Sequence, residues 1–382
     1  MEYIISGKYN LKIDRDRIAE ARDRCTKYYN KQKVDRLPFC YYSGKPDCPD
    51  YTYGDIIRDP DKLIQKTIAA INAQTESFPD TDYLPYLGLA HLGEGVVASM
   101  FGAEQYIVED NPPFTKGRVM QTIYELDKLP RRINPAEDGW GGKLKEVCEK
   151  FLDAVQGEVP VMVSDHQSPY GSATKICNNE ALMIAMYDEP EMVHEFFDIV
   201  TTGIEDTIDA MEKWCGAECL VKNVAVPVPG DKNGLIIWDD YISVINPVLH
   251  TEFCAPYNKR LYKKYGTGHL HTCGPYFKGY LDACINCEPK SLDISIMRGM
   301  SRSKEDIIEF RRITKEAGII LMGSADYTSD SIFDNKWGVK DDDYLRYMAD
   351  GGIFYSEWGQ KENGAERTKH WRDITRDIVN VW

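Results

Sequence analysis

Hydrophobic positions along this chain follow two alternating patterns. Short continuous runs of β-branched, aromatic and other apolar residues are each followed by polar residues and then by a longer amphipathic stretch. Continuous runs are typical of strands buried on both faces, and apolar residues three to four apart are typical of helices. Eight runs are predicted to be strands, at residues 37–42, 83–87, 159–164, 219–226, 268–272, 292–297, 318–322 and 352–355.

Helix-like segments lie between these runs. The stretch 181–214 has helical spacing, and Pro190 interrupts it, so we expect a second helix to begin there. Residues 303–317 open with a polar cap and an acidic first turn, which are typical of a helix N-terminus. Further amphipathic helices are expected around 63–71 and at 341–348.

Strand–helix alternation predicts an α/β fold with a parallel sheet and outer helices. Eight units in this length fit a (β/α)8 TIM barrel with N-terminal and loop insertions. The alternative is a doubly wound open sheet, which usually carries a glycine-rich phosphate-binding turn after an early strand. The first strand here leads into Ser43-Gly44-Lys45-Pro46, which is no such turn. We therefore expect one barrel domain over residues 1–382, with residues 1–33 as an N-terminal helical extension.

Composition narrows the function classes. The 382 residues include 46 Lys and Arg against 61 Asp and Glu, a formal net charge of −15, which argues against binding nucleic acid. No window approaches the roughly 18–20 apolar residues of a membrane span. The first residues do not resemble a secretion signal. The eleven cysteines are odd in number and lack a repeated spacing, so we expect reduced thiols in a cytoplasmic protein.

The residues after the predicted strands are polar, titratable or aromatic. In a barrel, chemistry lies at the carboxyl ends of the strands, and these positions include Tyr42, Asp165, His166, Gln167, Asn223, Asp326, Glu357 and Trp358. The paired acids Asp239 and Asp240 follow another apolar run. They would orient a substrate or a metal-bound histidine, or alternatively cap a helix.

The sharpest local signal is the segment His269-Leu270-His271-Thr272-Cys273-Gly274. Residues two apart on a strand face the same way, so His271 and Cys273 can bind one ion together. Imidazole and thiolate are typical zinc donors. The alternative is a core histidine beside a buried cysteine.

With these residues the chain resembles the uroporphyrinogen decarboxylase superfamily, and within it the zinc-dependent corrinoid methyltransferases that act on coenzyme M. The segment His271-Thr272-Cys273-Gly274 matches their His-x-Cys-Gly zinc motif. Weaker similarities are spread over most of the chain, at 34–38, 168–173, 183, 188–191, 245–247 and 253–257. The resemblance implies the (β/α)8 fold that the strand pattern predicts independently.

Two departures from the family pattern change the expected function. Decarboxylases of the superfamily carry an arginine-rich motif after the first strand, and this chain has none there, which argues against porphyrin decarboxylation. The methyltransferases have a cysteine as third zinc ligand just after the last strand, but this chain has no cysteine after Cys287. Glu357 is the candidate for that place, or else a charged residue opening the final loop. Cys284 and Cys287 form a C-x-x-C that is expected to pack within a helix, with metal binding as the alternative.

The resemblance therefore implies a zinc-dependent methyltransferase. It would move a methyl group between a small methylated substrate, such as a methoxylated aromatic, and the corrinoid (methylcobalamin) of a partner protein, since the chain lacks the cobalamin-binding Asp-x-His-x-x-Gly motif. The expected metal ligands are His271, Cys273 and Glu357. The catalytic candidates are Asp165, His166 and Asp240, and the substrate candidates are Tyr42, Gln167, Tyr170, Asp326 and Trp358.

Two other functions stay open at this point. One is a metal-free decarboxylase or lyase of the same superfamily, in which Asp165, His166 and Tyr42 would handle a carboxylated substrate. The other is a non-catalytic barrel that binds a ligand. Metal content separates the first of these from the methyltransferase.

Overall fold

A computed structural model describes residues 2–42, 46–77, 80–230, 233–273, 279–294, 304–324, 355–358, 369 and 372–373. The strands are β1 Glu2–Ser6, β2 Tyr9–Ile13, β3 Phe39–Tyr42, β4 Glu104–Tyr106, β5 Phe114–Lys116, β6 Val161–Met162, β7 Leu220–Val221, β8 Ile236–Trp238, β9 His269–Thr272, β10 Ser291–Ile294, β11 Ile320–Ser324 and β12 Tyr355–Trp358.

The α-helices are α1 Arg15–Tyr29, α2 Tyr53–Arg58, α3 Pro60–Ser77, α4 Val96–Met100, α5 Gly141–Ala154, α6 Pro169–Ile176, α7 Asn179–Asp188, α8 Pro190–Cys215, α9 Pro247–Leu249, α10 Ala255–Tyr265, α11 Tyr280–Asn286 and α12 Lys304–Glu316. Short 3-10 turns are η1 Ala90–Leu92, η2 Ile123–Lys128, η3 Ala217–Cys219 and η4 Asp240–Ser243. A π-helical turn, η5 His250–Cys254, leads directly into α10.

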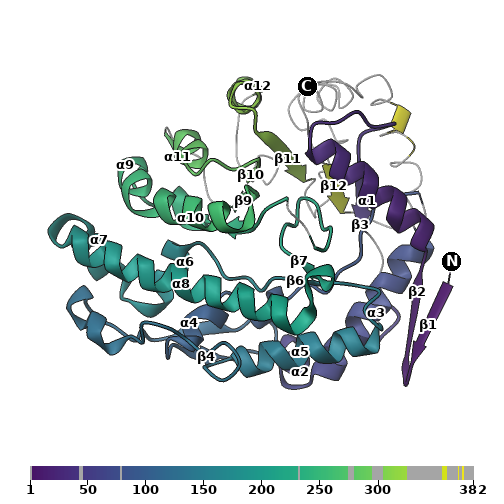
Figure 1. Cartoon of the computed structure of the whole chain (residues 1–382), viewed down its shortest axis with the longest axis horizontal. Helices are drawn as coiled ribbons and strands as arrows, with labels where there is room; N and C mark the ends of the chain where they lie inside the picture. Colours follow the sequence, from purple (N-terminus) through teal and green to yellow (C-terminus); the bar gives the residue numbers. More distant parts are fainter. Residues whose placement is uncertain are drawn as a thin grey trace.

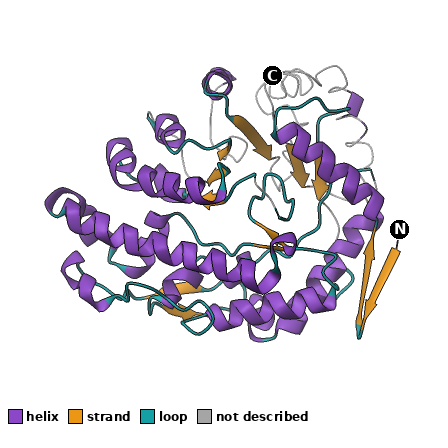
Figure 2. Cartoon of the chain, in the orientation of Figure 1, coloured by secondary structure: helices purple, strands orange, loops and turns teal. Residues whose placement is uncertain are grey.

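Parallel strands form the centre of the molecule. Six of them pair in the order β3-β12-β11-β10-β9-β8, and β6 pairs with β7. Figure 1 shows β9 to β12 and β3 in an arc above β6 and β7, and Figure 2 shows helices outside them. The α/β class with a parallel sheet is confirmed.

Isolated hydrogen bonds extend the pairing between the two sheets. The amide of Asp82 donates to the carbonyl of Phe39 at 2.8 Å, and Leu87 forms a parallel bridge with Val161. On the other side, the amide of Ile236 donates to the carbonyl of Lys222 at 2.7 Å. The predicted strand at 83–87 is therefore represented by one bridge. Strand β8 is not among the eight predicted strands, because it is only three residues long.

The N-terminus differs from the predicted helical extension. Residues 2–13 form an antiparallel hairpin, β1 and β2, and the helix α1 begins only at Arg15. The hairpin turns at Gly7, whose φ of 56° suits glycine. Leu11 and Ile13 are buried at alternate positions of β2, which packs against α3. This period of two, together with the turn glycine, favours strands over a helix.

The predicted break near Pro190 is confirmed. Helix α7 ends at Asp188, and Pro190 begins α8 at the first helical position, where its missing amide hydrogen costs nothing. Helix α12 also lies where its polar cap and acidic first turn predicted it. The predicted helix at 341–348 lies outside the described residues.

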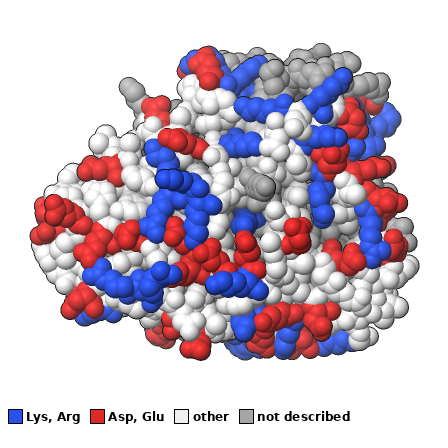
Figure 3. All heavy atoms as spheres, viewed as in Figure 1, with Lys and Arg blue, Asp and Glu red and all other residues white. Residues whose placement is uncertain are grey.

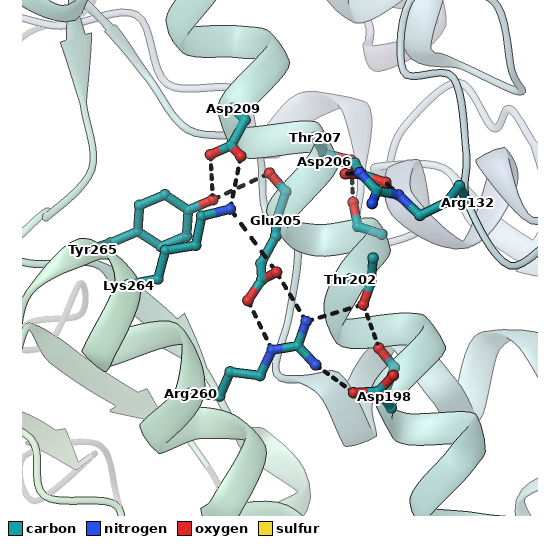
Figure 4. Close-up of polar contacts among 11 residues, drawn as sticks. Arg132, Asp198, Thr202, Glu205, Asp206, Thr207, Asp209, Arg260, Lys264 and Tyr265 are labelled. Atoms are coloured by element: carbon teal, nitrogen blue, oxygen red, sulfur yellow. Dashed lines mark hydrogen bonds and ion pairs between the residues drawn. The ribbon is translucent and has the colours of Figure 1, made fainter.

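Helices α8 and α10 are joined by a charged network on the outer surface. Arg260 binds both carboxylate oxygens of Glu205 at 2.9 Å and contacts Asp198 at 2.6 Å, while Lys264 and Tyr265 each bind Asp209 at 2.7 Å (Figure 4). Charges of both signs are interspersed over the face in Figure 3. Within the described part of the chain, no helix is both long and apolar enough to cross a membrane.

Candidate metal centre

Strand pairing between β9 and β10 places the first part of the site. His271 lies opposite Asp293 in the register, and His269 lies opposite Ser291. Directly opposed side chains in a sheet touch, and Nδ1 of His271 is 2.9 Å from Oδ2 of Asp293. A carboxylate only accepts, so Nδ1 carries a hydrogen, and Nε2 of His271 is the nitrogen that can bind a second proton or a metal.

Strand β8 brings the second part beside β9. Trp238, the last residue of β8, lies opposite His271, so Asp239 and Asp240 follow at the carboxyl end of the sheet. The backbone amide of Asp239 donates to the carbonyl of His271 at 2.9 Å. One residue further on, Oδ1 of Asp240 accepts the backbone amide of Cys273 at 2.7 Å. Asp240 is thereby fixed at the side of the His-x-Cys segment.

Asp240, His271 and Cys273 therefore form a group of potential metal donors. One ligand atom from each lies within 4.8 Å of those of the other two. Imidazole nitrogen, thiolate sulfur and carboxylate oxygen are the donor types that zinc takes in proteins. Asp240 and His271 are half-buried and Cys273 is exposed, so the group has an open side. The residues present fit a zinc ion with a position left for a substrate.

Asp293 dominates the electrostatics of this group. Burial by itself lowers the pKa of His271, but the hydrogen bond to Asp293 and its negative charge, with a smaller contribution from Cys273, outweigh burial and raise the pKa to about 10. Without a metal the imidazole thus binds a proton strongly. A metal cation bound to Nε2 would be stabilised by the same negative charges, those of Asp293 and Asp240.

The loop after β6 carries Asp165, His166 and Gln167. His166 is fully buried, its Nδ1 donates to the carbonyl of Gln167 at 2.7 Å, and burial lowers its pKa to about 4. Its ring meets that of Trp238 edge-on at 5.3 Å. Asp165 accepts from the side chain of Gln167 at 2.8 Å, and burial, with the charges of Glu94 and Asp240, raises its pKa to about 6. The loop therefore offers a neutral imidazole and an easily protonated carboxyl.

Other predicted residues lie elsewhere or outside the described side chains. Tyr170 is fully buried against Phe197 and Tyr241, and its hydroxyl donates to Asn179 at 3.2 Å, so it packs in the core. Glu357 and Trp358 pair on β12 with Tyr41 and Tyr42 of β3, and only their backbones are described. Asp326 lies outside the described residues. Cys284 and Cys287 are buried at α11, consistent with packing.

Two features of the site escaped the sequence reasoning. Asp293, the partner of His271, is a lone acid within an apolar strand, and that isolation is the signal that would have marked it. Asp240 was predicted as a catalytic residue, whereas the structure groups it with the metal donors. The contact with Cys273 depends on the pairing of β8 with β9, which no local pattern shows.

The comparisons with known proteins agree with this fold. The family model for uroporphyrinogen decarboxylase (URO-D) matches residues 20–328, and the chain belongs to this family. No curated protein gives a significant match. Among solved structures, a methyltransferase from Methanosarcina mazei is similar with a TM-score of 0.61 and 16% identity, over 92% of this chain and 98% of that one. At this identity the likeness shows the fold alone.

Proposed function

We propose that the protein is a zinc-dependent methyltransferase. It would move a methyl group between a small methylated substrate, with a methoxylated aromatic as first candidate, and the corrinoid of a partner protein in the cytoplasm. The observation that carries this proposal is the grouping of Asp240, His271 and Cys273 within 4.8 Å at the carboxyl end of β8 and β9. Membership of the uroporphyrinogen decarboxylase family and the similarity to a solved methyltransferase support it.

His271 and Cys273 would be two ligands of the metal, and the third is a carboxylate. Asp240 is the stronger candidate because its carboxylate lies in the donor group. Glu357 remains the second candidate; its strand, β12, is separated from β9 by β11 and β10 in the sheet order. A zinc ion with three protein ligands supplies Lewis acidity at its open position, which suits activation of an oxygen-bearing methyl donor or of a thiol.

The surrounding residues would bind and orient the substrate. Asp165 and Gln167 lie on the loop after β6, and the raised pKa of Asp165 allows its carboxyl to donate as well as accept. His166 stays neutral through burial and would orient the substrate rather than carry charge. Tyr42, Trp358 and Asp326 remain proposed contacts from the first, last and seventh strand ends.

We also infer that the parallel strands close into an eight-stranded barrel. The six-stranded sheet and the β6–β7 pair are linked on both sides. On one side residues 82–87 contact both Phe39 and Val161, and on the other Ile236 contacts Lys222. Family membership favours the same closure. The donor group would then lie at the rim where barrel enzymes carry their sites.

Metal analysis of variants tests the function. Cys273→Ser and His271→Ala should reduce zinc per chain to near background, because two remaining ligands seldom hold zinc against buffer. Asp240→Asn and Glu357→Gln, compared side by side, should identify the carboxylate ligand by the larger loss. Cys219→Ser, whose sulfur faces the carbonyl of Gly157 at 3.8 Å, serves as the matched control.

Methyl transfer is measured on the same proteins with free methylcobalamin or cob(I)alamin as the corrinoid. The wild type should show transfer that the Cys273→Ser and His271→Ala variants lose. Full zinc in Cys273→Ser would sink the metal assignment. A wild-type protein that is zinc-free and active on a carboxylated substrate would instead identify the metal-free lyase.

A further inference from the structure

Asp239 is a fully buried carboxylate with three side-chain donors around it. Its Oδ1 accepts from the hydroxyl of Ser168 at 3.0 Å. Its Oδ2 accepts from Nε2 of His250 at 3.0 Å and from the amide of Asn258 at 2.8 Å. Despite burial, which alone raises the pKa, the pKa of Asp239 is lowered, chiefly by His250 and the other hydrogen bonds. A carboxylate this enclosed stays in one position.

The main chain beside Asp239 holds the donor group directly. Its amide donates to the carbonyl of His271 at 2.9 Å, and the next residue, Asp240, accepts the amide of Cys273. The preceding carbonyl, that of Trp238, accepts the amide of Ser168 at 2.7 Å. The loops after β6 and β8 and the end of β9 are therefore tied together by Asp239 and its two neighbours, Trp238 and Asp240.

Asp239, His250 and Cys287 also lie within 4.8 Å of one another, but they do not read as a second metal site. The oxygens of Asp239 and Nε2 of His250 already bind each other, Ser168 and Asn258. Burial and the charge of Asp239 raise the pKa of the Cys287 thiol far above its usual value, so it is protonated. This buried group is closed, whereas the group of Asp240, His271 and Cys273 has an exposed member.

We propose that Asp239 is a positioning residue that fixes Asp240, His271 and Cys273 in their ligating arrangement before the metal binds. The inference rests on the proposed function and deepens it. Ligands held in place lose less conformational freedom on binding, so affinity rises without a new contact to the metal. His250 and Asn258 act through Asp239, because each donates to its carboxylate.

The test compares two isosteric changes at buried aspartates. Asp239→Asn replaces an acceptor of three side-chain bonds near the donor group. Asp82→Asn is the matched control, because Asp82 is also buried and accepts from Arg24, Arg36 and the amide of Phe39 at the beginning of β3. Zinc affinity is measured by chelator competition on full-length protein that circular dichroism shows to be folded. The visible spectrum of the cobalt(II)-substituted protein reports ligand geometry.

Asp239→Asn should weaken zinc binding by about 10- to 100-fold, the range seen when supports of metal ligands are removed, and should change the cobalt spectrum. Asp82→Asn should leave the zinc affinity within about twofold of the wild-type value and should leave the cobalt spectrum unchanged, because Asp82 supports no metal ligand. If Asp239→Asn does not fold, His250→Ala takes its place, and His250→Gln, which keeps an N–H donor, should recover most of the affinity.

The outcomes separate this inference from the function on which it rests. A wild-type protein without zinc affinity overturns both. A wild-type protein that binds zinc through Cys273, together with unchanged affinity and spectrum in Asp239→Asn, overturns the positioning role alone. Equal losses of affinity in Asp239→Asn and Asp82→Asn also overturn it, because general loosening of the fold would then account for the effect.

Discussion

Asp82 and Asp239 are both buried aspartates, but they stand at opposite ends of the parallel strands. Asp82 binds Arg24 and Arg36 and accepts the amide of Phe39, the first residue of β3. Asp239 follows the last residue of β8 and is surrounded by a histidine and two neutral donors. Sites in parallel α/β folds lie at the carboxyl ends of strands, and the opposite ends serve stability. The same residue type therefore lies at the stabilising end of the strands in one case and at the end that carries the candidate site in the other.

The difference in partners determines how much free energy of unfolding is lost when each aspartate is replaced. Arg24 and Arg36 carry fixed charges, and their guanidinium groups are mostly buried, with 12% and 19% of the side chains exposed. Removing Asp82 takes a carboxylate partner from both guanidinium groups, although Arg24 still binds Asp35 at 2.7 Å. Ser168 and Asn258 are neutral, and the imidazole of His250, unlike a guanidinium, can release its proton, so removing the charge of Asp239 leaves polar atoms but no fixed charge behind.

The largest expected effect is thus on stability, at Asp82. Asp82→Ala should lower the free energy of unfolding by about 3–5 kcal/mol, because it takes this carboxylate from the mostly buried guanidinium groups of Arg36 and of Arg24, although Arg24 still binds Asp35. The urea midpoint of unfolding measures this loss. Zinc per chain should stay at the wild-type level in the folded protein. A loss below about 1 kcal/mol, the value of exposed pairs, would contradict the contrast.

The second effect is on the metal, at Asp293. Asp293→Ala removes the acceptor that orients His271 and should weaken zinc affinity by about 10- to 100-fold. Ser291→Ala is the control on the same strand, because Ser291 contacts His269 at 2.9 Å instead of His271. Chelator competition on both variants decides the matter. Equal affinities would show that the contact between Asp293 and His271 does not support metal binding.

The sequence predicts this division only in part. Continuous apolar runs and helical spacing are local, so they located most strands and the break at Pro190. His271 and Cys273 were also readable, because two residues apart on one strand share a face. Asp293 was not, and Asp240 was predicted as a catalytic residue instead of a ligand, because the contacts of both come from the pairing of β9 with β10 and with β8. Register between strands depends on packing across the sheet, which one strand's pattern does not contain.

At the N-terminal segment the local sequence does carry the signal, but the prediction did not use it. The expectation of a helical extension treated residues 1–33 as one unit, yet the first strand pair ends at Ile13. Its period of two spans only a few residues on each side of Gly7, and Asp14 then caps α1 by accepting the amide of Arg17. A strand pattern this short is outweighed, in a prediction from sequence, by the long helical pattern that follows it, although the turn glycine marks the boundary between them.

A third, smaller effect concerns pH and the loop at the site. The pKa of Asp165 is about 6 in the folded protein against 3.8 for the free side chain. The folded state therefore holds the proton more tightly, and the free energy of unfolding should fall as pH rises from 4 to 6 and then level off. The contribution is about 1–2 kcal/mol after allowance for partial exposure.

Asp165→Asn should flatten this part of the pH profile, since the amide does not titrate. Urea midpoints at intervals from pH 4 to pH 7 measure the slope for both proteins. An unchanged slope would mean that Asp165 is solvated and ionises normally, and its assignment as a proton donor to substrate would fail with it.

The smallest effect is expected at the outer surface of α10. Arg260 binds Glu205 and Asp198 of α8, but a third of its side chain is exposed, so solvent screens the charges. Arg260→Ala should lower the free energy of unfolding by about 0.5–1 kcal/mol, as for partly exposed pairs. Asn258 lies two residues earlier on the same helix and faces Asp239, so zinc affinity also reports whether α10 has shifted. We expect that affinity to be unchanged, with Lys264→Ala as a parallel variant from the same network. A clear loss of zinc affinity in Arg260→Ala would mean that the outer charges of α10 help to position Asp239. The residues that support the site would then extend outward to the acidic residues of α8.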